Sequence, residues 1–129
     1  FGFHFHDGSK CEGDLHDPFS GAMSHYNPKG CDHPFHAGDM PPLFSNHGCA
    51  FSVFLSDRFS LSEVIGKTVI IHGNPDDFIT QPSGNSGVKL GCGIIGAVDK
   101  PTFSRDNRNA KRGFEAYFLY SGNKKGLLT

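Results

Sequence analysis

The chain begins FGFHFH (residues 1–6), where phenylalanine occupies every second position and histidine enters between them. Successive side chains of a β-strand point to opposite faces, so the phenylalanines share one face while His4 and His6 share the other. An aromatic row on one face is typical of a strand that packs against a hydrophobic core. This stretch therefore predicts a strand that holds two imidazole rings together on the face opposite the core.

Short apolar runs separated by glycine- and proline-containing loops recur along the 129 residues. Such runs, rich in β-branched and aromatic residues, predict strands and hairpins. Three runs predict strands and a fourth predicts a hairpin: CAFSVFLSDRF (49–59), KTVIIH (67–72), VKLGCGIIGAV (88–98) and FEAYFLYSGNKKGLLT (114–129). Ser60 and Glu63 have the spacing of a capping box, which predicts one helical turn. The pattern favours an antiparallel all-β domain with long loops.

The composition limits the partners and the compartment. A formal net charge of −1 gives no basis for binding nucleic acid or a membrane surface. No apolar run approaches the ~18 residues that a bilayer-spanning helix requires. The four cysteines include no C-x-x-C pair, which argues against a thiolate zinc site. An even count in a loop-rich β chain favours two disulfides and a secreted or otherwise oxidising location over buried thiols.

The irregular stretch of residues 11–44 is long for a small domain, which is typical of a functional loop. It contains three histidines and an aspartate at close spacing: His25, His33, His36 and Asp39. Histidine and aspartate are ligands of borderline metals such as zinc and copper(II), and three histidines with one aspartate form a sound zinc set. The loop therefore predicts a metal site.

The remaining histidines divide into a second group and two isolated residues. His4 and His6 on their strand face, with His72 at the end of VIIH, are suited to a second ion with an open position. The spacing alone leaves open whether one ion or two is bound. His16 and His47 have no evident partners and are expected at the surface.

These residues resemble the copper/zinc superoxide dismutase family. The motifs GFHxH, HxNP, HAGDxP, VIIHxxxDD and GNxGxxxxCGxIG occur in family order over residues 1 to about 98, roughly three quarters of the chain. The segments PPLF, DRF and QPSGNSG are similar to the secreted bacterial branch. The resemblance implies an antiparallel Greek-key β-sandwich or flattened barrel with long metal-binding loops.

Carried over position by position, the resemblance implies two metals that share one ligand. The copper ligands match His4, His6, His25 and His72. The zinc ligands match His25, His33, His36 and Asp39. Asp76 matches a carboxylate that orients one histidine of each metal, and Cys11 and Cys92 match the family disulfide. The implied catalytic residues are His25, as the bridge, and Lys89, at the position of the arginine that guides the substrate.

The implied reaction is dismutation of superoxide, a small anion, to O₂ and H₂O₂ by a redox-cycling copper bridged through histidine to zinc. Lysine in place of arginine keeps the positive charge but loses the planar fork of donors, so weaker guidance and a lower rate are implied. The alternative is a non-catalytic metal-binding or assembly protein built on this domain, which Lys89 and the short zinc loop favour. A copper or zinc buffer is a third reading.

Two features depart from the family pattern near the zinc loop. His33 and His36 are only three residues apart, where the family has a longer segment. Cys31 and Cys49 lie outside the family pattern, and we expect a disulfide between them to pin the shortened loop. The rival interpretation is that Cys31 is a metal ligand.

The ends of the chain also depart from the family. The strands that precede GFHxH are missing, so we expect an upstream portion and an exposed sheet edge that another copy or a tandem neighbour completes. We divide the chain into a dismutase-like domain (1–98), a linker (99–112) and a β-hairpin (113–129). The hairpin resembles the family's first two strands and is expected to replace them, the alternative being an unrelated tail.

Overall fold

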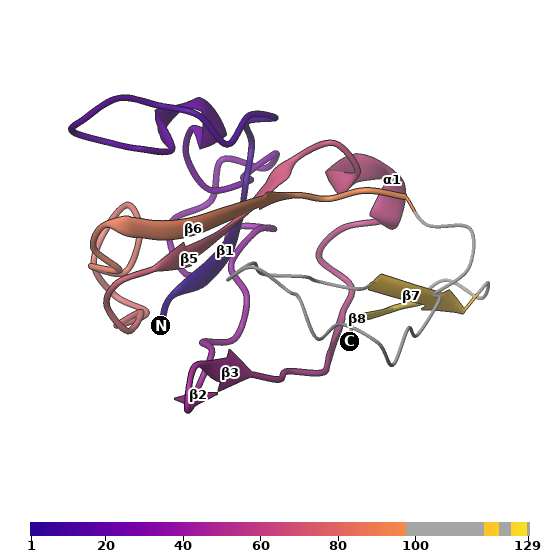
Figure 1. Ribbon diagram of the computed structural model, residues 1–129. Helices are drawn as coiled ribbons and strands as arrows, with labels where there is room; N and C mark the ends of the chain where they lie inside the picture. Colours follow the sequence, from indigo (N-terminus) through magenta and orange to yellow (C-terminus); the bar gives the residue numbers. More distant parts are fainter. Residues whose placement is uncertain (98–117, 122–124, 129) are drawn as a thin grey trace.

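The central element of the fold is a three-stranded antiparallel sheet in which β5 lies between β1 and β6. The computed structural model describes residues 1–97, 118–121 and 125–128. Its central strands are β1 (Phe3–His6), β5 (Thr68–His72) and β6 (Lys89–Ile94). Figure 1 shows these three strands side by side, although β1 is separated from β5 by a long stretch of chain.

Two smaller sheets use the remaining strands. β2 (Ser45–Asn46) and β3 (Cys49–Ala50) form a short hairpin, and β4 (Phe54–Ser56) pairs with β8 (Lys125–Leu128). β8 in turn pairs with β7 (Phe118–Ser121). The single strand predicted over 49–59 is therefore two strands, because β3 and β4 pair with different partners.

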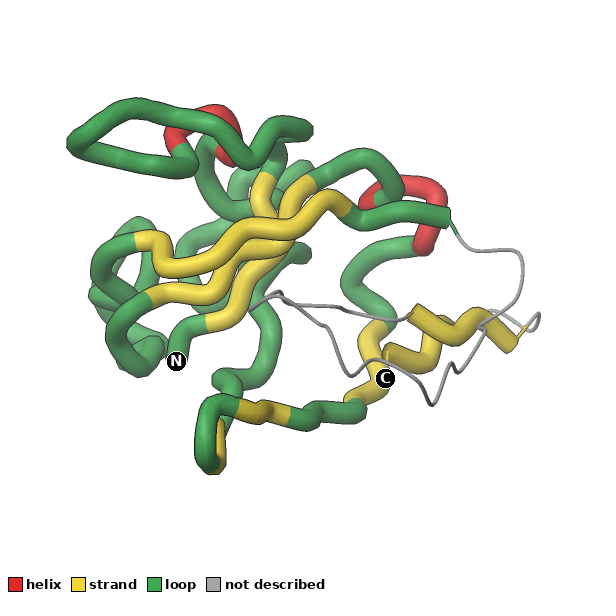
Figure 2. The backbone as a smooth tube through the Cα atoms, viewed as in Figure 1, coloured by secondary structure: helices red, strands yellow, loops and turns green. Residues whose placement is uncertain are grey.

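The all-β, antiparallel class predicted from the sequence is confirmed. Among the described residues, the helical elements are one 3₁₀ turn, η1 (Ser20–Ala22), and one short helix, α1 (Leu61–Val64). The helix begins with the predicted capping box, in which the Ser60 backbone N–H donates to Glu63 Oε2 at 2.7 Å. No helix in the described ranges is long and apolar enough to cross a membrane. Figure 2 shows that loops make up much of the remaining path.

β1 is buried on both of its faces. Phe3 and Phe5 enter a hydrophobic core that also contains Tyr26, Ala37, Met40, Val64, Val69 and Ile95. His4 and His6 are buried on the other face, as the alternation predicts. Phe1 falls outside the aromatic row, since 41% of its surface is exposed.

The register of the sheet brings a third histidine to the polar face of β1. His4 lies opposite Ile70, and residues directly opposite in a sheet share a face. His72 lies two residues after Ile70 on the same strand, so its side chain points to the same face as those of Ile70 and His4. The sheet thereby collects His4, His6 and His72 on one side.

The predicted domain division is not tested by this structure. The linker (99–112) lies outside the described residues, and so does much of the segment 113–129. The described part of that segment is the antiparallel pair β7–β8, which is joined to β4. The expectation that it replaces the family's first strands stays a prediction.

We expect Phe5→Ala to lower the free energy of unfolding by about 3–5 kcal/mol, because it removes a buried aromatic ring from the core. The ring of Phe5 is fully buried and lies 5.2 Å from that of Phe59, measured between centroids. Urea unfolding of the metal-free protein, followed by circular dichroism, measures the loss. The matched control is Phe51→Ala, whose side chain is 85% exposed. Equal losses in the two variants would contradict this core.

Candidate metal centre

The structure brings the seven predicted ligand residues together in two sets that share one histidine. The first set is His4, His6, His25 and His72. The second set is His25, His33, His36 and Asp39. Within each set, one potential ligand atom from every residue lies within 4.8 Å of the others. Strands β1 and β5 supply three members, and the loop between β1 and β2 supplies the rest.

Backbone carbonyls select the ring nitrogens that face the interior of the first set. His6 Nδ1 donates to the carbonyl of Met23 at 2.8 Å, and His72 Nδ1 donates to that of Gly87 at 3.3 Å. A carbonyl only accepts, so both neutral rings carry their lone pairs on Nε2. These two Nε2 atoms lie 3.2 Å apart. Two lone pairs facing each other repel, and a cation between them removes the repulsion.

The carboxylate of Asp76 orients one ring in each set. Asp76 Oδ2 accepts from His4 Nε2 at 2.7 Å, and Asp76 Oδ1 accepts from His33 Nε2 at 2.8 Å. The backbone N–H of Phe78 holds the same carboxylate at 2.7 Å. Any Cβ at Gly84, which has φ of +65°, would collide with this carboxylate, so the position requires glycine.

This orientation leaves the metal-facing nitrogens of both rings without partners. His4 Nδ1 and His33 Nδ1 are buried and have no hydrogen bond to any described residue. Buried polar atoms are rarely left unpaired, so each such nitrogen calls for a partner beyond the hydrogen bonds that the described residues offer. A metal ion at each set would supply it.

The second set converges on the carboxylate of Asp39. His25 Nδ1 lies 2.8 Å from Asp39 Oδ1, and His36 Nδ1 lies 3.3 Å from the same oxygen. His33 Nδ1 lies 3.1 Å from Asp39 Oδ2. Three imidazole nitrogens and one carboxylate, all in one small volume, are the donors of a closed four-coordinate zinc site.

His25 belongs to both sets through its two ring nitrogens. Its Nδ1 faces Asp39, whereas its buried Nε2 has no hydrogen-bond partner within the described ranges. The His25 ring lies 3.9 Å from that of His4 and 5.0 Å from that of His6, measured between centroids. One imidazole therefore stands between the two sets and can be a ligand of both.

Burial keeps the first set in its ligating state. It lowers the pKa of His4 to about 2, that of His6 to about 3 and that of His72 to about 4, with repulsion between neighbouring rings contributing. These rings are neutral at physiological pH, and neutral imidazole is the form that binds a metal.

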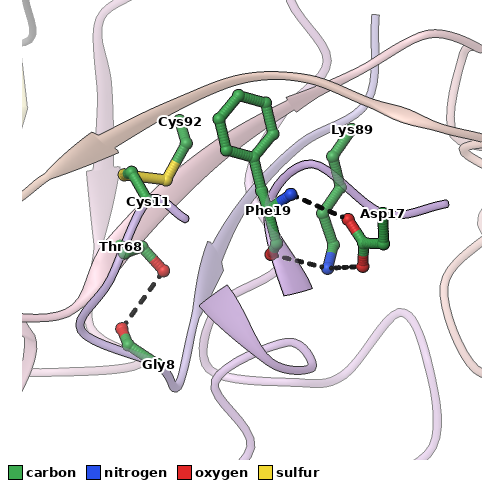
Figure 3. The surroundings of a disulfide bond; sticks show 7 residues. All are labelled: Gly8, Cys11, Asp17, Phe19, Thr68, Lys89 and Cys92. Carbon is green, nitrogen blue, oxygen red and sulfur yellow. Dashed lines mark hydrogen bonds and ion pairs between the residues drawn. A yellow bond between two sulfur atoms is a disulfide. The ribbon is translucent and has the colours of Figure 1, made fainter. Parts of the chain in front are cut away.

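A disulfide ties the loop after β1 to the edge strand of the sheet, as the resemblance implies. Cys11 and Cys92 are bonded across 81 positions of sequence. Figure 3 shows Lys89 near this bond, with its ammonium directed to Asp17 and Phe19. Lys89 Nζ donates to Asp17 Oδ2 at 2.7 Å and to the carbonyl of Phe19 at 3.1 Å.

The prediction of a Cys31–Cys49 disulfide is wrong, since both thiols are free in the structure. Cys49 belongs to the exposed hairpin β2–β3, which projects away from the central sheet (Figure 1). Cys31 is held instead by Asn27, whose side chain donates to the Cys31 carbonyl at 2.8 Å and accepts from its N–H at 3.0 Å. Cys31 also lies outside both ligand sets, contrary to the rival interpretation.

Hydrogen bonds that the sequence interpretation missed hold the short loop in place of a disulfide. Arg58 Nη1 donates to the carbonyls of Pro34 and His36 at 3.1 Å and of Asp39 at 3.3 Å. Gln81 exchanges two hydrogen bonds with the backbone of His33, at 2.7 and 2.9 Å. Every residue has a backbone carbonyl, so accepting one of these hydrogen bonds requires no particular residue type. Residue spacing therefore could not have revealed these contacts.

Alkylation of the denatured but unreduced protein should add two labels per chain, one at each of the two free cysteines. Digestion should also yield a linked peptide that contains Cys11 and Cys92. Mass spectrometry measures both. A protein that takes up no label would contradict the structure and restore the second disulfide.

Arg58→Gln should lower the affinity of the second set for zinc by about 10- to 100-fold, as loss of groups that orient ligands does. The reason is that Arg58 holds the backbone of two potential ligands, His36 and Asp39. Competition with a chromophoric chelator measures the affinity. Lys29→Gln is the matched control, since it removes one exposed positive charge near the same loop. Similar affinities in both variants would exclude a positioning role for Arg58.

Comparison with known proteins agrees with the geometry. The family model described as copper/zinc superoxide dismutase (SODC) matches residues 1–95. Superoxide dismutase [Cu-Zn] 2 of Aquifex aeolicus (strain VF5) is 32% identical over 108 residues, which cover 72% of this chain and 61% of that protein. Superoxide dismutase [Cu-Zn] 1 of the same organism is 33% identical over 110 residues, which cover 72% of this chain and 62% of that protein.

This chain therefore spans about three fifths of the length of the curated relatives that it matches. The family match nevertheless covers residues 1–95 and includes both ligand sets. Copper and zinc are the cofactors that these findings support. The chain belongs to the copper/zinc superoxide dismutase family.

Proposed function

We propose that this protein dismutates superoxide, converting two superoxide anions and two protons into O₂ and H₂O₂. Copper is held by the first set, His4, His6, His25 and His72, and zinc by the second, His25, His33, His36 and Asp39. The observation that carries the proposal is the buried His25 ring, which has one nitrogen beside the second set and an unpaired nitrogen toward the first.

The donor chemistry of each set fits the assigned metal. Imidazole nitrogens suit copper, and an all-imidazole set accommodates both of its oxidation states. Three histidines and an aspartate are a closed set for zinc. When bound, copper supplies a one-electron couple that takes an electron from one superoxide and returns it to a second, while zinc supplies a fixed charge without redox chemistry.

The protein's own residues hold the rings and the protons. Asp76 keeps a proton on His4 Nε2 and on His33 Nε2, which directs the other nitrogen of each ring to its metal set. Of the two ring nitrogens of His25, Nδ1 contacts Asp39 and Nε2 does not. It is the atom at which a proton can be held next to the first set and given to a reduced substrate.

Lys89 is the cation proposed to attract the substrate. It lies opposite His72 in the register of β5 and β6, so its charge stands beside the first set. An ammonium attracts a small anion as a point charge, without the fork of donors that arginine provides. A lower rate than that of relatives with arginine is part of the proposal.

The disulfide supports an oxidising location, and secretion is the proposed route to it. A second copy or a tandem neighbour that completes the sheet also remains a proposal. All seven candidate ligands come from this chain, on β1, on β5 and in the loop between β1 and β2.

The wild-type protein loaded with copper and zinc should remove superoxide, measured as inhibition of cytochrome c reduction. His25→Ala should abolish this activity and leave copper content above half of the wild-type value, since three imidazoles remain for copper. His47→Ala changes an exposed histidine outside both sets and is the control. Inactivity of the wild type at full copper occupancy would exclude dismutation and favour the non-catalytic metal-binding protein.

A further inference from the structure

Beside the first histidine set, where the family resemblance leads us to expect a cation that guides the substrate, the structure has an ion pair. Lys89 Nζ lies 2.7 Å from Asp17 Oδ2 and also donates to the carbonyl of Phe19. Figure 3 shows the ammonium held between these two groups. The Asp17 side chain is 40% exposed and that of Lys89 is 15% exposed, so the carboxylate stands on the solvent side of the pair.

A β-bulge places this pair beside the metal ligands. Ile71 pairs with Gly91, and without an irregularity His72 would pair with Leu90. The register shifts after Ile71, so Lys89 is opposite His72 instead. Bulges re-aim side chains in this way next to active sites.

The carboxylate partner comes from a segment that also touches the first set. Asp17 and Met23 lie in the same loop, and the Met23 carbonyl accepts from His6 Nδ1. Asp17 is held in place from its own backbone, because the Phe19 N–H donates to Asp17 Oδ1 at 3.0 Å. The hydrogen bond from Lys89 lowers the pKa of Asp17, so the carboxylate is charged at physiological pH.

We propose that Asp17 sets the affinity of the copper set for small anions by neutralising the charge of Lys89. The inference rests on the proposed function, since it concerns anions that reach copper at the first set. A neutral pair in place of a lone cation lowers the electrostatic attraction for every monoanion, whatever its chemistry. Asp17 is therefore a determinant of anion affinity and not a catalytic residue.

The size of the effect follows from Coulomb's law. A unit charge at a distance on the order of 8 Å from a bound anion changes its affinity about threefold to tenfold at dielectric constants of about 30–60, which lie between about 20 near a protein surface and about 80 in bulk water. Asp17→Asn removes the charge and leaves one acceptor oxygen, for either the Lys89 ammonium or the Phe19 N–H. The ammonium also keeps its hydrogen bond to the Phe19 carbonyl.

The test is a titration of the copper- and zinc-loaded protein with azide, a small monoanion that binds copper, followed by its charge-transfer absorbance. Asp17→Asn should bind azide about threefold to tenfold more tightly than the wild type at low salt. The gain should shrink as added salt shortens the screening length. Lys89→Gln should weaken azide binding. Because the Coulomb contributions of separate charges add, Asp17→Asn should raise azide affinity by a similar factor in the Lys89→Gln background.

The matched control is Glu12→Gln, which makes the same change in net charge in the same loop. Glu12 forms an exposed ion pair with Lys10, at 3.2 Å, that has no part in the Lys89 contacts. This variant should bind azide within about twofold of the wild type, as expected of an exposed and screened charge.

The outcomes separate the inference from the proposed function. Azide affinity equal to or weaker than wild type in Asp17→Asn, in a wild type that removes superoxide, would overturn the inference alone. Tighter azide binding by Asp17→Asn in an inactive wild type would support the inference and exclude dismutation. An equal gain in Glu12→Gln would show an effect of net charge only and would also overturn it.

Discussion

The burial of β1 on both of its faces is the constraint on which the rest of the structure depends. Its two phenylalanines enter the core, and its two histidines need polar partners on the opposite side. The long loops supply a partner to one nitrogen of each ring, the Met23 carbonyl for His6 and the Asp76 carboxylate for His4. The remaining nitrogens turn inward, and an unpaired buried acceptor costs about 1–3 kcal/mol. Metal binding relieves this cost, so metal occupancy and stability are coupled.

Much of the central sheet and of the two ligand sets could be predicted from the sequence. Alternation marks β1, and a β-branched run marks β5, because burial imposes these patterns on consecutive residues. The ligand types could be identified because few side chains bind borderline metals. Their division between copper and zinc, the role of Asp76 and the disulfide were implied by family resemblance, since they join residues that are distant in the sequence.

What the sequence could not show is how the loops are held. Arg58, Asn27 and Gln81 all bind backbone groups, and a backbone carbonyl is the same at every residue. The predicted Cys31–Cys49 disulfide was wrong. It rested on the number of cysteines and on the short loop's need for a restraint, and neither says how far apart the two cysteines lie. The break between β3 and β4 was missed for a related reason: strand pairing partners, rather than local propensity, decide where each strand ends.

The Asp17–Lys89 pair bears on the lysine that the family resemblance aligns with a substrate-guiding arginine. An arginine at this position has five N–H donors, enough to hold a carbonyl and still face an anion with its planar fork. Lysine has three, and its contacts with Asp17 and the Phe19 carbonyl engage two of them. In its proposed role, Asp17 acts on both the net charge and the donors that Lys89 can offer, so the lysine and Asp17 must be considered together.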